Sequence, residues 1–179
     1  TGLTIGINVL ANGALTAIAV AKAAGAKFIR VNQWANAYVA NEGFVEGEAA
    51  KVSRYRSWLR AKNLKVFADV HVKHGSHAIV ADRSITELTR DAEFFDADAV
   101  IATGQRTGDS ATYDEIKTIK SATSLPVLVG SGVNVENIAE ILSVADGVII
   151  ASSLKRDGLW WNEVDTERVA EFMKAVRRI

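Results

Sequence analysis

The chain has 179 residues, of which 49% are hydrophobic, and it contains no cysteine. Its 21 Lys and Arg residues balance 21 Asp and Glu residues, so the formal net charge at pH 7 is zero. This composition predicts a single globular domain over residues 1–179, excludes disulfides and thiolate catalysis, and gives no electrostatic reason to expect a nucleic-acid partner, which would need a basic face.

Six short apolar runs have the composition of buried strands. Each run is rich in Val, Ile or Phe and ends at small or polar residues. Runs that are apolar on both faces are typical of a parallel sheet covered by helices, so we expect parallel strands. In chain order the runs span residues 3–10, 28–32, 65–72, 99–103, 126–130 and 147–151.

Helical segments with capping signals alternate with these strands. Ser84 with Glu87, and Thr112 with Glu115, have the spacing of capping boxes, in which side chains satisfy backbone N–H groups at the start of a helix. The predicted helices span residues 13–24, 46–61, 85–95, 113–122, 135–142 and 166–178, and the other predicted N-caps are Asn12, Asn134 and Asp165.

The predicted order is β-α repeated six times, which gives a parallel sheet that is either open and doubly wound or closed into a barrel. The one long connection, residues 33–45, carries Trp34, Tyr38 and Phe44. Connections of this length are usually functional or mobile. The aromatic side chains fit either a lid over a ligand site or a contact with a second subunit, and the sequence does not choose between them.

Two successive predicted strands end in small residues, which favours a closed barrel. In such barrels the turns after the last two strands bind phosphate through backbone N–H groups, although glycine and serine also pack tight barrel rims. Lys155 and Arg156 follow the second turn and would add positive charge. The predicted phosphate-binding residues are Gly130, Ser131 and Gly132 in the first turn and Ser152 and Ser153 in the second.

The alternation of side chains along the strands predicts a ring of polar residues at the mouth of the barrel. Within it we expect Asp69, His71 and Lys73 to be catalytic: Lys73 as a base or Schiff-base nucleophile, Asp69 or His71 in proton transfer. The alternative is a buried ion pair between Arg30 and Asp69 that only holds the interior together. The predicted ring comprises Asn8, Arg30, Asn32, Asp69, His71, Lys73, Thr103 and Ser131.

The three histidines, His71, His74 and His77, lie close together just after Asp69. Histidine and carboxylate side chains can hold Zn²⁺ or another divalent ion. However, His74 and His77 fall in a predicted loop, so the spacing does not favour a tight site. We therefore predict no metal ligands, keep a divalent ion as the weaker alternative, and leave the cofactor open.

Several strings of residues, in order along the whole chain, resemble the BtpA/SgcQ family. The resemblance implies an α/β fold of the (β/α)8 TIM-barrel type, of which this chain holds six βα units, from the third strand to the eighth. The chain begins at Thr1 rather than Met, and we expect two further βα units upstream. The matching strings span residues 7–10, 28–32, 43–47, 67–74, 103–108, 129–133 and 145–158.

Two hypotheses for the function follow from the residues and the resemblance. The first is a lyase or isomerase that acts on a phosphorylated small molecule, such as a sugar phosphate or a nucleotide. The second is a non-catalytic assembly or stability factor, since cyanobacterial members of the family are associated with the accumulation of photosystem I. No apolar run approaches the roughly 20 residues that span a bilayer. We expect a cytoplasmic protein, with peripheral thylakoid association in a photosynthetic organism. We also expect it to form a homo-oligomer.

Overall fold

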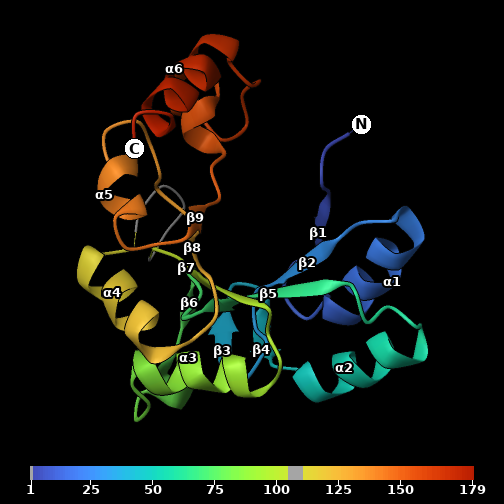
Figure 1. The fold of residues 1–179 in the computed structure, drawn as a ribbon. Coiled ribbons are helices and arrows are strands. Elements are labelled where there is room, and N and C mark those ends of the chain that lie inside the picture. Colours follow the sequence, from blue (N-terminus) through green and yellow to red (C-terminus); the bar gives the residue numbers. More distant parts are fainter. Residues whose placement is uncertain (1, 105–110) are drawn as a thin grey trace.

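The computed structural model describes residues 2–104 and 111–179, and its centre is a curled sheet of six parallel strands (Figure 1). Each strand pairs in parallel with the next strand of this sheet along the chain. Within the described residues the two edge strands, β1 and β9, do not pair with each other. The strands are β1 (Gly6–Asn8), β2 (Phe28–Val31), β5 (Lys65–Val70), β7 (Ala99–Ala102), β8 (Val127–Val129) and β9 (Gly147–Val148).

A helix follows every strand of this sheet, which confirms the six predicted βα units and the α/β class. Neighbouring helices pack in pairs, α1 on α2, α3 on α4 and α5 on α6. In the part of the chain that the structure describes, no helix combines the length and apolarity needed to cross a bilayer. The helices are α1 (Ala14–Ala24), α2 (Ala49–Trp58), α3 (Ile85–Phe94), α4 (Tyr113–Ala122), α5 (Ile138–Leu142) and α6 (Thr166–Val176).

The hydrophobic core lies between the sheet and its helices. Val66 and Ala68 of β5 are fully buried, and they belong to the same apolar cluster as Ile18 of α1, Val52 of α2 and Ile119 of α4. Burying one such branched side chain stabilises the fold by about 1.5–3 kcal/mol. This apolar layer fixes the strands, and therefore the positions of the polar residues at their carboxyl ends.

Three of the predicted helix caps are present. The Ser84 hydroxyl accepts a hydrogen bond from the backbone of Glu87, and the Thr112 hydroxyl accepts one from Glu115. The Asp165 carboxylate accepts two backbone N–H groups at the start of α6. These caps anchor the ends of three helices that begin near the carboxyl edge of the sheet.

Of the other two predicted caps, Asn12 is wrong because its side chain has another partner, whereas Asn134 makes the hydrogen bond expected of a cap. The Asn12 side chain bonds the backbone of Phe44 and Glu46, and no side chain caps α1. The Asn134 side chain accepts the backbone N–H of Asn137, and the Asn137 side chain accepts the backbone N–H of Asn134, which is the reciprocal pattern of a capping box. The regular helix α5 nevertheless begins only at Ile138.

The predicted long connection is instead part of a small antiparallel sheet. It contains β3 (Ala37–Ala40) and β4 (Gly43–Glu46), and the short strand β6 (Gly75–Ser76) pairs with the other side of β3. Trp34 and Tyr38 are buried within the protein, so they are not available to form a lid or a subunit contact. Phe44 is half-exposed and still fits either role.

Candidate functional site

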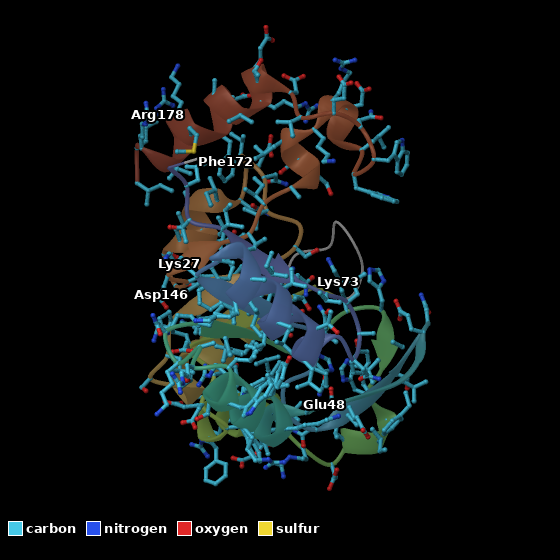
Figure 2. All side chains as sticks on the ribbon, turned by 90° about the vertical axis from the view of Figure 1, so that its right-hand side faces the viewer. Lys27, Glu48, Lys73, Asp146, Phe172 and Arg178 are labelled. Carbon is cyan, nitrogen blue, oxygen red and sulfur yellow. The ribbon has the colours of Figure 1, made fainter. Side chains whose placement is uncertain are left out.

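The polar residues predicted at the strand ends gather at the carboxyl edge of the sheet. Lys73 follows β5, whereas Lys27 and Asp146 precede β2 and β9. Figure 2 shows Lys73 at one end of the parallel strands and the other two residues at the opposite end. A cavity of about 380 Å³ lies at this edge, within the roughly 300–1,000 Å³ of small-molecule sites. The predicted site residues that line it are Arg30, Lys73, Gly130, Ser131, Gly132, Ser152 and Ser153.

The turn at residues 130–132, which we call the glycine turn, requires its glycines. A Cβ atom at Gly130 would lie 2.7 Å from Cγ2 of Ile101, too close for any larger residue. Gly132 has φ +63°, in the left-handed region that favours glycine. Ser153 ties the next turn to this one, because its hydroxyl donates to the carbonyl of Val133 at 2.6 Å. The two turns are thereby held together beside the cavity.

Behind the cavity lies the ion pair between Arg30 and Asp69, which was the structural alternative for these two residues. The guanidinium donates through Nε at 2.9 Å and Nη2 at 3.0 Å, and the Asn32 amide donates to the same carboxylate at 2.9 Å. Burial raises the pKa of Asp69, while Arg30, Asn32 and the Lys73 ammonium oppose that shift. Asp69 and Asn32 therefore position Arg30 and do not line the cavity.

Lys73 is held by residues from two neighbouring strand ends. Its backbone N–H donates to the hydroxyl of Thr103, which is fully buried after β7. Its ammonium donates to the Ser131 hydroxyl of the glycine turn at 3.0 Å. Thr103 thus fixes the backbone of Lys73 without lining the cavity. Since β7 lies between β5 and β8, the Lys73 side chain crosses the end of β7 to reach Ser131.

Arg168 is a cavity residue that the sequence interpretation missed. It lies in the first turn of α6, and its Nη1 donates to the carbonyl of Ser153 at 3.2 Å. The expected cation Arg156 pairs instead with Glu163 at the surface and, like Lys155, does not line the cavity. The available signal was the Asp165 cap, since a cap at the carboxyl edge brings the first turn of its helix there as well.

Asn8 and His71 do not reach this cavity. The Asn8 side chain donates to the backbone carbonyl of Arg30 and is exposed. Strand β5 ends at Val70, and His71 has φ +55°, so the alternation expected up to Val72 stops two residues early. The prediction that His71 shares one mouth with Lys73 is therefore wrong.

Comparison with known proteins places this chain in a family. A model described as the BtpA family matches residues 1–178. The chain belongs to the BtpA family. Part of one string that carries the resemblance, residues 105–108, lies outside the described residues.

Two relatives show how much of a BtpA-family protein this chain represents. A mitochondrial protein of Caenorhabditis elegans is 40% identical over 174 residues, which cover 97% of this chain and 62% of that protein. The photosystem I biogenesis protein BtpA of Synechocystis is 38% identical over 173 residues, covering 96% and 60%. The chain thus spans less than two thirds of the length of these relatives.

The BtpA-family chain also resembles solved structures of low sequence identity. Thiamine phosphate pyrophosphorylase from Pyrococcus furiosus aligns with 99% of this chain and 84% of its own, with a TM-score of 0.56 and 17% identity. Likeness at this identity shows the fold alone. It agrees with a curled parallel sheet of the TIM-barrel type.

A second hollow of about 440 Å³ in this BtpA-family chain contains His71 and lies beside α3 and α4. The His71 ring packs on His77, with ring centres 4.2 Å apart, and its Nδ1 lies 3.9 Å from Oε1 of Glu115. That distance is too long for a hydrogen bond. Burial lowers the pKa of both histidines, which favours their neutral forms. Among residues 2–104 and 111–179, no group of three acidic, His or Cys side chains converges as a metal site.

Glu115→Gln is expected to leave stability at acidic pH unchanged and to raise it by about 1 kcal/mol at pH 8. Burial raises the pKa of Glu115, and its Oε1 has no hydrogen-bond partner among the described residues. The native state therefore holds this proton more tightly than the unfolded state, so stability is lost as pH rises through the raised pKa. Urea unfolding between pH 4 and pH 8 measures the difference.

The matched control for this prediction is Glu87→Gln. Glu87 occupies the same position after the Ser84 cap but is half-exposed beside Arg90. We expect no pH-dependent gain from this variant. A Glu115→Gln protein that is less stable than the parent at pH 8 would contradict the prediction.

Proposed function

We propose that this BtpA-family chain binds a phosphorylated small molecule at the carboxyl ends of β8 and β9. The observation that carries the proposal is one cavity that joins the glycine turn, Ser152 and Ser153 with the cations Lys73 and Arg168. Phosphate binding at the last two strand ends is common in barrels of this type. The name of the structural relative, a thiamine phosphate pyrophosphorylase, is consistent with a phosphorylated ligand.

The proposed role of the cavity is catalysis on a sugar phosphate or a nucleotide, as a lyase or an isomerase. Lys73 is the group best placed to act at reacting atoms, because its ammonium lies on the cavity wall beside the glycine turn. Asp69 is engaged by Arg30, and His71 lies in the second hollow, so neither is assigned a chemical step in this cavity.

Arg168→Met is expected to weaken the binding of phosphorylated ligands by about tenfold or more, because a charge-assisted hydrogen bond contributes about 1.5–3 kcal/mol. Titration calorimetry of the purified protein with inorganic phosphate, glucose 6-phosphate and AMP measures the affinity, with glucose and adenosine as unphosphorylated controls. Arg178→Met is the matched control, since Arg178 is exposed beyond the other end of the same helix (Figure 2). Absence of binding by all three phosphates to the parent protein would refute the proposal.

A second candidate function is assembly or stabilisation of another protein complex. The name of the Synechocystis relative, a photosystem I biogenesis protein, favours it. Trp160 and Trp161 also form an exposed edge-to-face pair that suits a protein contact, in a homo-oligomer or with a partner. This candidate gains weight if the parent protein binds no phosphorylated ligand and Trp160→Ala with Trp161→Ala changes its oligomeric state.

A further inference from the structure

The cavity carries basic side chains on both sides of the glycine turn. Lys73 comes from β5 and bonds Ser131 at the turn itself. Arg168 comes from α6 and bonds the carbonyl of Ser153, beyond β9. In the sheet order β5-β7-β8-β9, Lys73 thus approaches the end of β8 from the β5 side and Arg168 approaches it from beyond β9. The described residues that line the cavity include no Asp or Glu.

The side of the cavity toward β5 offers mostly hydrogen-bond donors. Arg30 uses Nε and one N–H of Nη2 for Asp69, which leaves three of its five N–H groups for other partners. Lys73 carries three N–H donors and no acceptor. Ligand atoms on this side therefore have to accept hydrogen bonds, and ionised acceptors form the stronger bonds with these cations.

The side toward β9 is separately equipped for an anion. Arg168 forms no ion pair within the described part of the chain, and its guanidinium borders the cavity next to Ser152 and Ser153. A phosphate on this side would meet Arg168, Ser152 and Ser153. Lys73 and Arg30 line the other side of the same cavity, where another part of the same ligand would lie.

We propose that the ligand of this cavity carries two anionic groups, a phosphate held toward Arg168 and a carboxylate or second phosphate held toward Lys73 and Arg30. This inference rests on the proposed function and narrows its substrate class to phosphorylated acids and bisphosphates. A singly phosphorylated neutral sugar occupies only the Arg168 side.

The experiment compares two small probes that differ mainly in the second anionic group, 3-phosphoglycerate and glycerol 3-phosphate. Titration calorimetry of the purified protein is expected to show at least tenfold tighter binding of 3-phosphoglycerate. Equal affinities for the two probes would overturn the inference and leave the proposed function intact. Binding of neither probe, nor of inorganic phosphate, would overturn both.

Variants assign the two groups to the two sides of the cavity. Lys73→Met is expected to bring the affinity ratio of the two probes close to one while glycerol 3-phosphate still binds. Arg168→Met is expected to weaken both probes by a similar factor and to keep the ratio. A ratio unchanged in Lys73→Met would contradict the assignment. The parent protein's own ratio tests the inference even if either variant folds poorly.

Discussion

Asp69→Leu is expected to lower the free energy of unfolding by about 3–5 kcal/mol, because it leaves the Arg30 guanidinium without its counter-charge in a largely buried position. Asp69 itself is buried, and it accepts two bonds from Arg30 and one from Asn32. The loss far exceeds what the ion pair adds to stability, since the larger part is the penalty for an unpaired buried charge. Urea unfolding at pH 7 measures it.

The double variant Arg30→Met with Asp69→Leu separates these two contributions. Replacing a buried pair by apolar side chains of similar volume is often nearly neutral, so we expect the double variant to recover most of the loss. The exposed pair of Glu87 and Arg90 is the control, and Glu87→Leu there should change stability by about 0.5 kcal/mol or less. A loss below about 1 kcal/mol in Asp69→Leu would show that water reaches Arg30 freely.

The alternation of strands and helices could be predicted because each element carries its own local signal. The buried strands are apolar on both faces, and the Ser84 and Thr112 caps are encoded within four residues. Helices α2 and α5 start three residues later than predicted, and Asn12 does not cap α1. The Asn12 side chain bonds a hairpin more than 30 residues away, and no local pattern encodes that contact.

The candidate site was predictable where it depends on strand order. The glycine turn and Ser152 follow consecutive strands of a parallel sheet, so their proximity follows from topology alone. Arg168 was missed because its position depends on the tertiary packing of α6, and His71 was misplaced because its position depends on one backbone torsion. His71, directly after β5, has a left-handed backbone conformation that redirects the chain. Such a conformation is usually predicted from a glycine, and this position has none.

Trp34→Ala is expected to lower the free energy of unfolding by about 3–5 kcal/mol, the range for removing a large aromatic from a core. Trp34 is only 1% exposed, and its indole N–H donates to the carbonyl of Phe95 at 3.0 Å. Its own carbonyl accepts the backbone N–H of Ala49 at the start of α2. The residue therefore joins the segment before β3 to α2 and to the end of α3, and its loss should loosen the small antiparallel sheet.

Two further variants separate the packing of Trp34 from its hydrogen bond. Trp34→Phe retains much of the apolar volume and loses the bond to Phe95, so we expect a smaller loss than for alanine. Trp58→Ala is the matched control, because Trp58 is 76% exposed at the end of α2 and should change stability by about 0.5 kcal/mol or less. Equal losses for Trp34→Ala and Trp58→Ala would mean that the segment before β3 is not part of the core, and it would restore the interpretation of residues 33–45 as a mobile lid.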